Sequence, residues 1–237
     1  MRAKDISNRD RLIFALDVAD TDQARALVGQ LGDAVSFYKL GLELCMSGGY
    51  FELLEWMVKQ GKKIFVDLKF FDVPATVAAA VKNLHNRGVT YATIHGNQSI
   101  MEAAAEAKGE VKILAVTALT SLDRGDLDDL GFNCDVGKLV LSRARRALEA
   151  GCDGVIASGL ELEALRAAVD DRLLVITPGI RPVENRPADD QKRVVTVEDA
   201  FHNGADHIVV GRPIRNADDP KAAAETIQKS IEQIFSE

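Results

Sequence analysis

The chain has 237 residues, 27% of them charged, and a formal net charge of −7. This length fits one large α/β domain or two small ones, and the acidic balance without a run of lysine and arginine argues against nucleic-acid or membrane partners. No apolar stretch is long enough for a transmembrane helix, and residues 1–5 are too polar to begin a signal peptide. Three widely spaced cysteines, with no Cys-x-x-Cys pair, indicate free thiols in a reducing compartment. We therefore expect a soluble, cytoplasmic protein.

Short apolar runs alternate with longer amphipathic segments along the whole chain. This alternation predicts a parallel sheet, and the nearly continuous hydrophobicity of the short runs predicts strands buried on both faces. The expected strands are residues 12–18, 35–40, 64–70, 89–95, 111–117, 154–157, 173–177 and 207–210. Helical patterns between and after them include residues 22–30, 50–59, 76–86, 138–149, 161–168, 197–203 and 220–235.

Two features favour closure of this sheet into a barrel. A glycine stands one to three residues before most expected strands, where a left-handed residue ends the preceding helix: Gly32, Gly61, Gly88, Gly109, Gly151 and Gly204. About eight βα units also match the ~250 residues of a typical (β/α)₈ barrel. The alternative is an open doubly wound sheet, but no Gly-x-Gly-x-x-Gly motif follows the first strand. We expect a single α/β domain, a (β/α)₈ TIM barrel over residues 1–237.

One long segment lacks periodicity. Residues 181–193, between the seventh strand and its helix, contain two prolines, two aspartates and an asparagine. Loops of this length inside a compact domain are uncommon unless they are functional. We expect this loop to act as a lid over the site.

Charged residues stand where the first three strands end. Barrel enzymes place their sites at the carboxyl ends of the strands, and here these ends carry Asp17, Lys39, Asp67 and Lys69, with Asp72 after a short turn. Each charge, taken singly, has an alternative interpretation as an ordinary strand-end residue facing solvent, and Asp72 as a helix cap. An inward-facing aspartate and lysine are nevertheless costly unless they pair or take part in chemistry.

The ends of the last two strands have the composition of an anion site. Pro178-Gly179 and Gly211-Arg212 offer close backbone approach, and the guanidinium suits a phosphate. The alternative is that the glycines only form tight turns. His95, at the end of the fourth strand, is more typical of a hydrogen-bonded core residue, and no histidine spacing indicates a metal site.

These charges favour a particular chemistry. Neighbouring carboxylates hold the Lys69 ammonium protonated, which makes it a proton donor and a poor Schiff-base nucleophile. Asp67 and Asp72 repel a substrate carboxylate, so loss of CO₂ relieves the repulsion while the ammonium stabilises and protonates the carbanion. The sequence therefore predicts decarboxylation, or another carbanion reaction, of a phosphorylated substrate.

The Asp67-x-Lys69-x-x-Asp72 motif resembles the signature of the orotidine 5′-phosphate decarboxylase family. The resemblance extends, in the same order along the chain, to residues 14–17, 39–41, 177–181, 190–191 and 211–213. It implies conversion of orotidine monophosphate to uridine monophosphate and CO₂, the last step of de novo pyrimidine synthesis, with no metal and no organic cofactor.

The resemblance also implies roles for individual residues. Lys69 protonates the pyrimidine carbon that loses CO₂, Asp67 lies near the departing carboxylate, and Lys39 and Asp72 complete the charge network and contact the ribose with Asp17. Other substrate contacts fall on residues in the loops: Thr120 or Ser121 (base), Arg181 and Arg212 (phosphate), Gln191 (base and phosphate), and Thr76, Pro178 and Gly211. The family forms homodimers in which residues 72–76 reach the neighbouring subunit's site.

Two alternatives remain open. One is a magnesium-dependent sugar-phosphate decarboxylase or hexulose-phosphate synthase of the same superfamily, although these relatives hold the metal partly with an acidic residue on the second strand, where this chain has Lys39. The other is a non-catalytic barrel that binds phosphoribosyl groups. Such a protein has little reason to keep both the acidic and the basic members of the charged set.

Overall fold

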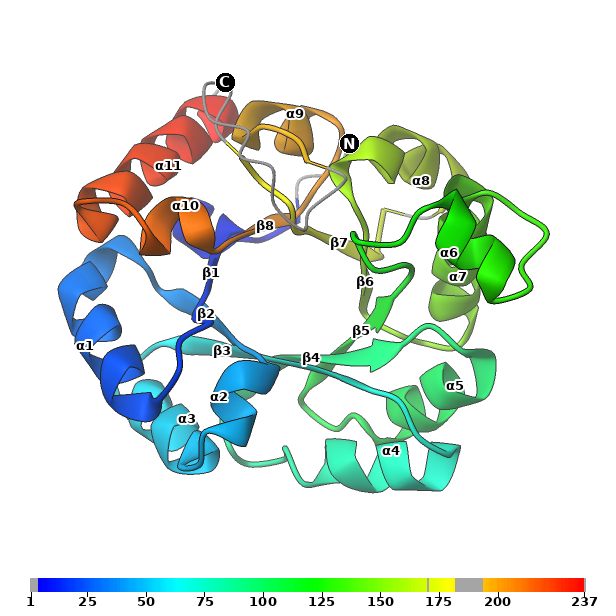
Figure 1. The fold of residues 1–237 in the computed structure, drawn as a ribbon, viewed down its shortest axis with the longest axis horizontal. Coiled ribbons are helices and arrows are strands. Elements are labelled where there is room, and N and C mark those ends of the chain that lie inside the picture. Colours follow the sequence, from blue (N-terminus) through cyan, green and yellow to red (C-terminus); the bar gives the residue numbers. More distant parts are fainter. Residues whose placement is uncertain (1–3, 170, 182–193, 237) are drawn as a thin grey trace.

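The computed structural model describes residues 4–169, 171–181 and 194–236. Eight parallel strands form one closed barrel in sequential order, β1 to β8, with the helices in a ring around it (Figure 1). The prediction of a single-domain (β/α)₈ barrel is confirmed. Apart from Arg181, the expected lid over residues 181–193, with Gln191, lies outside the described residues.

The strands match the predicted apolar runs closely. They are β1 (Leu12–Ala15), β2 (Phe37–Leu40), β3 (Lys63–Phe70), β4 (Val89–His95), β5 (Lys112–Val116), β6 (Gly154–Ile156), β7 (Leu174–Thr177) and β8 (His207–Val210). The six glycines expected to end helices all have positive φ, from 50° at Gly32 to 106° at Gly204. Glycine adopts this conformation without the clash that a Cβ atom brings, so each helix turns back into the barrel within a few residues.

The helices cover the outside of the barrel. They are α1 (Thr21–Leu31), α2 (Leu42–Met46), α3 (Tyr50–Lys59), α4 (Pro74–Lys82), α5 (Gln98–Ala107), α6 (Arg124–Asp129), α7 (Val136–Glu149), α8 (Leu162–Ala168), α9 (Val197–His202), α10 (Arg212–Arg215) and α11 (Pro220–Phe235), with 3₁₀ turns at Asn8–Arg11, Gly32–Ala34 and Gly159–Glu161. Among the described residues, no helix is both long enough and apolar enough to cross a membrane.

Two separate apolar clusters follow from the alternation of side chains along each strand. The larger one packs the outer face of the barrel against the helices. The smaller one fills the barrel and includes Phe37, Phe65 and Tyr91. Two residues further along the same strands, on the same inward face, stand Lys39, Asp67 and Thr93. The apolar filling therefore forms the floor beneath a polar layer.

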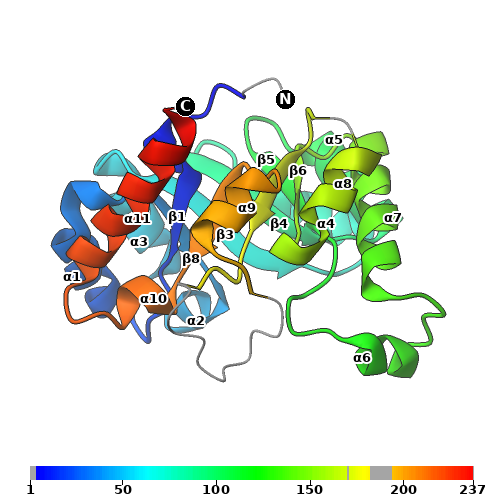
Figure 2. The same ribbon diagram turned by 90° about the horizontal axis from the view of Figure 1, so that it is seen from above.

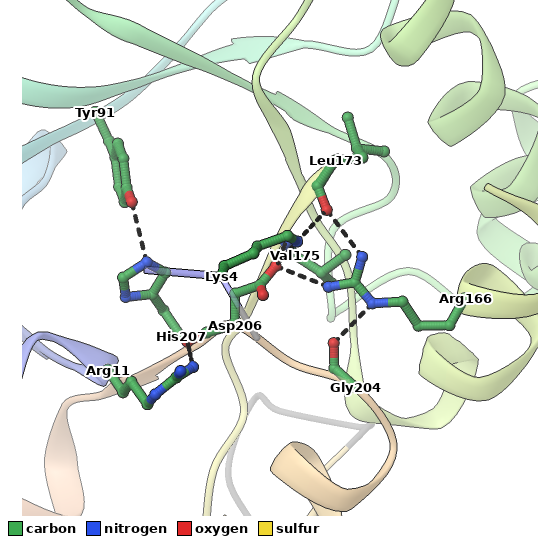
Figure 3. Close-up of polar contacts among 9 residues, drawn as sticks. All are labelled: Lys4, Arg11, Tyr91, Arg166, Leu173, Val175, Gly204, Asp206 and His207. Atoms are coloured by element: carbon green, nitrogen blue, oxygen red, sulfur yellow. Dashed lines mark hydrogen bonds and ion pairs between the residues drawn. The ribbon is translucent and has the colours of Figure 1, made fainter. Parts of the chain in front are cut away.

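A polar network closes the amino-terminal end of the barrel (Figure 3). The Asp206 carboxylate accepts hydrogen bonds from Lys4, from Arg166 at 2.7 Å and from the Val175 amide at 2.8 Å. His207 lies beside it and bonds the Tyr91 hydroxyl at 3.0 Å. The helices α2, α6 and α10 lie at the opposite end of the barrel, around the carboxyl ends of the strands (Figure 2), where barrel enzymes place their sites.

Candidate active site

A cavity of about 470 Å³ opens at the carboxyl ends of the strands. It is lined by ten of the residues predicted for the site: Asp17, Lys39, Asp67, Lys69, Thr120, Ser121, Pro178, Arg181, Gly211 and Arg212. They come from β2 and β3, from the loops after β1, β5, β7 and β8, and, for Arg212, from α10. The barrel therefore gathers into one volume residues that are separated by up to almost the whole chain.

Four of these residues form a row of alternating charge. Lys39 Nζ lies 3.0 Å from Asp17 Oδ1 and 3.3 Å from Asp67 Oδ2, and Lys69 Nζ lies 2.9 Å from Asp67 Oδ1. Both oxygens of Asp67 are thus engaged by ammonium groups. The side chain of Lys69 is 33% exposed and that of Lys39 only 12%, so Lys69 is the ammonium nearer to an entering substrate.

Mutual attraction keeps the buried members of this row charged. Burial alone raises the pKa of Asp67, but the ammonium groups of Lys39 and Lys69 outweigh it and hold that pKa below its usual value. Burial lowers the pKa of Lys39, yet Asp67 and Asp17 together raise it above its usual value. The row is therefore an ordered set of fixed charges, which is the condition for electrostatic catalysis away from bulk water.

A bulge in β3 brings Asp67 and Lys69 to the cavity. Between the pairs Val66–Ala92 and Phe70–Ile94, β3 contributes Asp67, Leu68 and Lys69, whereas β4 contributes Thr93 alone. Lys69 there has a φ of 47°, in the left-handed region. The simple alternation of an extended strand predicted that Asp67 and Lys69 share a face; they do both line the cavity, but through this bulge, which re-aims side chains as bulges commonly do.

Asp72 and Thr76 are placed differently from the rest. Both are exposed, and neither lines the cavity of its own chain. The Asp72 carboxylate accepts a hydrogen bond from the Val73 amide at 2.6 Å, one residue before α4. In the described chain, the carboxylate that pairs with Lys69 is that of Asp67. In this structure the Asp72 side chain therefore lies apart from the cavity of its own chain.

Arginines occupy the other side of the cavity. Arg181 follows β7, and Arg212 and Arg215 belong to α10 after β8. The Arg181 guanidinium donates to the Ile180 carbonyl at 2.8 Å, while Arg215 donates to the backbone carbonyl of Asp17. Arg215 was missed from the sequence, although its position one turn after Arg212 on a short helix is the signal that could have found it. The cavity thus has a cationic side at β7 and β8.

His95 lies outside the cavity lining. Its ring packs on Phe71 with centroids 4.4 Å apart, and its Nδ1 lies 3.1 Å from Asn97 Oδ1. Burial lowers its pKa. The predicted hydrogen bond is present, but His95 is only half-buried and packs on the exposed Phe71, so it is not the core residue that was favoured from sequence.

Comparisons with known proteins agree with this geometry. The model of the orotidine 5′-phosphate decarboxylase/HUMPS family matches residues 10–227. The chain belongs to this family. It is 65% identical over 233 residues to an orotidine 5′-phosphate decarboxylase of Methylococcus capsulatus, covering 98% of this chain and 96% of the relative. It is 52% identical over 224 residues to an orotidine 5′-phosphate decarboxylase of Stenotrophomonas maltophilia, covering 94% of this chain and 92% of that relative.

Solved structures of the family have the same fold. The crystal structure of an orotidine 5′-phosphate decarboxylase from Lactobacillus acidophilus superposes with a TM-score of 0.83 at 35% identity, covering 94% of this chain and 99% of that one. The family resemblance that the Asp67-x-Lys69-x-x-Asp72 motif indicated is therefore confirmed over almost the full chain.

Proposed function

We propose that this protein decarboxylates orotidine 5′-monophosphate to uridine 5′-monophosphate and CO₂. The observation that carries the proposal is the row Asp17–Lys39–Asp67–Lys69 on one side of a cavity whose other side carries arginines. The names of the relatives that share most of this sequence support the same reaction.

The distribution of charge gives the substrate one orientation. Its phosphate fits Arg181 and Arg212, because guanidinium groups bind phosphate oxygens with paired hydrogen bonds. Its pyrimidine then extends across the barrel mouth toward β3, past Thr120 and Ser121, with the carboxylate directed at Asp67. The ribose lies beside Lys39 and Asp17. The apolar floor of the cavity keeps water away from the ring.

The chemistry follows from these positions. The substrate carboxylate meets the negative charge of Asp67, and this repulsion is relieved when the C–C bond breaks and CO₂ leaves. The electron pair stays on the pyrimidine carbon, where the Lys69 ammonium stabilises it and then donates a proton, forming the new C–H bond. Lys69 regains a proton from solvent after product release. Every step uses fixed charges of the protein and needs no cofactor.

We further propose that the working unit is a homodimer, with Asp72 and Thr76 of each chain completing the partner's site. The support for this proposal comes from the residues that flank Asp72. The residues on either side of Asp72 are apolar but highly exposed, with Phe71 at 64% and Val73 at 63%. Large exposed apolar side chains that lie together are typical of a surface that contacts another protein chain.

The main alternative is a magnesium-dependent enzyme such as a hexulose-phosphate synthase. The family name, which joins orotidine 5′-phosphate decarboxylase with the HUMPS group, includes enzymes of this second kind. Lys39, at the position where such enzymes present an acid, disfavours a cation there because its ammonium already pairs with Asp17 and Asp67.

The free thiols of Cys45, Cys134 and Cys152 suit a reducing compartment such as the cytoplasm.

The test is a spectrophotometric assay of orotidine monophosphate consumption in excess chelator, with uridine monophosphate and CO₂ measured as products. We expect undiminished turnover with equal amounts of both products. Turnover that requires added magnesium favours the magnesium-dependent alternative, and nucleotide binding without turnover means a non-catalytic barrel.

A further inference from the structure

Thr93 stands opposite the bulge that carries the two central charges. It is the single β4 residue between the pairs Val66–Ala92 and Phe70–Ile94, facing Asp67, Leu68 and Lys69 on β3. Its side chain is fully buried and does not line the cavity. Thr93 therefore contacts Asp67 and Lys69 on the side away from the cavity and has no access to substrate.

The Thr93 hydroxyl bonds two groups of the bulge, one backbone amide and one side-chain carboxylate. The Lys69 amide donates to Thr93 Oγ1 at 3.0 Å, and Thr93 Oγ1 donates to Asp67 Oδ1 at 2.9 Å. The first bond holds the Lys69 backbone at a φ of 47°, which a lysine seldom adopts. The second fixes the rotation of the carboxylate whose two oxygens meet Lys69 and Lys39.

We propose that Thr93 is a positioning residue that sets the geometry of Asp67 and Lys69 through these two hydrogen bonds. This inference rests on the proposed function for its kinetic consequence, but the contact itself can be tested without turnover. Because the bonds act on the carboxylate and ammonium end of the site, their loss affects the chemical step more than the binding of the phosphate end.

The decisive variant is Thr93→Val, which keeps the shape and removes the hydroxyl. We expect kcat to fall about 10- to 100-fold while KM changes less than about threefold. Thr93→Ser, which restores the hydroxyl, should recover most of the activity. Thr117→Val is the matched control, because Thr117, directly after β5, is equally buried and its hydroxyl donates to the Ile156 carbonyl at 2.7 Å; it should keep a normal kcat.

One further readout and a second variant separate positioning from a loss of folded protein. Calorimetric binding of uridine monophosphate counts intact sites, and their number should be unchanged in Thr93→Val. Thr93→Cys, of similar size but with a weak donor and acceptor, serves as the second variant. If sites are lost in proportion to kcat in both variants, or if Thr93→Ser is as impaired as Thr93→Val, the proposal is overturned.

Amide hydrogen exchange tests the contact independently of catalysis. The Lys69 amide should exchange faster in Thr93→Val than in the wild type, while amides of β5 exchange unchanged. An inactive wild type would contradict the proposed function, yet the exchange result would still decide the role of Thr93. An active wild type together with unchanged kcat and unchanged Lys69 exchange in Thr93→Val would overturn the positioning role alone.

Discussion

At the scale of single residues, the site depends on a backbone conformation that costs free energy. A non-glycine residue with its backbone in the left-handed region costs about 1–2 kcal/mol. Lys69, two residues after Asp67, adopts this conformation. Ion pairing with Asp67 and the hydrogen bond from the Lys69 amide to Thr93 offset this cost. Strain of this kind is typical of functional sites, where the surroundings fix a geometry that an isolated strand does not hold.

Gly41 gives a prediction at this scale. A Cβ atom there would lie 3.1 Å from Asp17 Oδ1 and 3.2 Å from Lys39 Nζ, tight enough to push the row of charges apart. We expect Gly41→Ala to lower kcat/KM by about tenfold or more. The φ of −105° at Gly41 suits alanine, so the free energy of unfolding should change by less than about 1 kcal/mol.

The control is Gly29→Ala on α1, where an added Cβ meets nothing within 4 Å. It should stabilise the helix by about 0.5–1 kcal/mol and leave kcat/KM unchanged. Steady-state kinetics and urea unfolding of both variants check the pair. Normal kinetics in Gly41→Ala would show that the Lys39 and Asp17 positions are not critical.

His207 predicts how stability depends on pH. Burial lowers the pKa of His207 to about 4, against about 6.5 in an unfolded chain. Asp206 opposes this shift and Arg11 adds to it. Because the unfolded state binds the proton more tightly, this stability is fully present above pH 6.5 and is lost as the pH falls toward 4.

Urea unfolding at pH 7 and pH 5 checks this expectation. The free energy of unfolding of the wild type should fall by about 2 kcal/mol more between these pH values than that of His207→Gln, which does not titrate. Equal pH dependence in the two proteins would mean that His207 is not held neutral by the fold.

At the scale of elements, the strands were predictable because they are buried on both faces. All eight predicted apolar runs correspond to strands, and only their ends differ. The first was predicted to reach residue 18 but ends at Ala15. The Leu16 amide still donates to the Lys39 carbonyl at 3.0 Å, and the chain then leaves the ladder and carries Asp17 to the cavity. Hydropathy alone does not show where pairing stops.

All the helices predicted from the sequence are present, and apart from α4 their ends lie within two residues of the predicted ones, even in the short α8 and α9. α3 and α11 have the predicted limits. The helix expected at residues 76–86 is α4, which begins at Pro74 and ends at Lys82. A proline is favoured in the first turn of a helix because its φ is already helical. The chain then leaves the helix, and Asn86 adopts a φ of 59°.

Several helices were not named from the sequence. α5 buries Ile100 and Met101, but its other inward residues are alanines, which give a weak apolar pattern. α2, α6 and α10 span only four to six residues, and each buries a single residue, so none has an apolar stripe. α6 depends on a capping box between Asp123 and Asp126. Short rim helices are set by loop and cap contacts, which the hydrophobic pattern does not encode.

At the scale of the whole molecule, the site was predictable because a closed parallel barrel brings all strand ends to one rim. That rule alone placed most of the predicted residues in the cavity. It fails for Asp72 and Thr76, which the described chain leaves exposed. A role in a partner's site needs a second subunit. Neither the hydrophobic periodicity of the sequence nor the spacing of its residues predicts how two chains assemble.

Subunit mixing tests this partnership. Lys69→Ala and Asp72→Ala chains are each expected to be nearly inactive. If Asp72 acts across the interface, a mixed dimer contains one site with an intact Lys69 and an intact Asp72. An equal mixture of exchanging chains should therefore recover about a quarter of wild-type activity.

Sedimentation of the same mixtures provides the control, since recovery must follow the fraction of dimer as the protein is diluted. Absence of recovery in mixtures that are shown to be dimeric would place Asp72 in its own chain's site, or outside any site.

The central claim is that the ammonium at the end of β3 delivers the proton to the carbanion. The direct measurement is kcat for Lys69→Ala beside Lys63→Ala, which removes an exposed lysine at the opposite end of the same strand, where it pairs with Asp10. We predict a loss of about 10²–10⁴-fold or more for Lys69→Ala, with uridine monophosphate still bound, and near-normal turnover for Lys63→Ala. Turnover by Lys69→Ala at the wild-type rate would contradict the account.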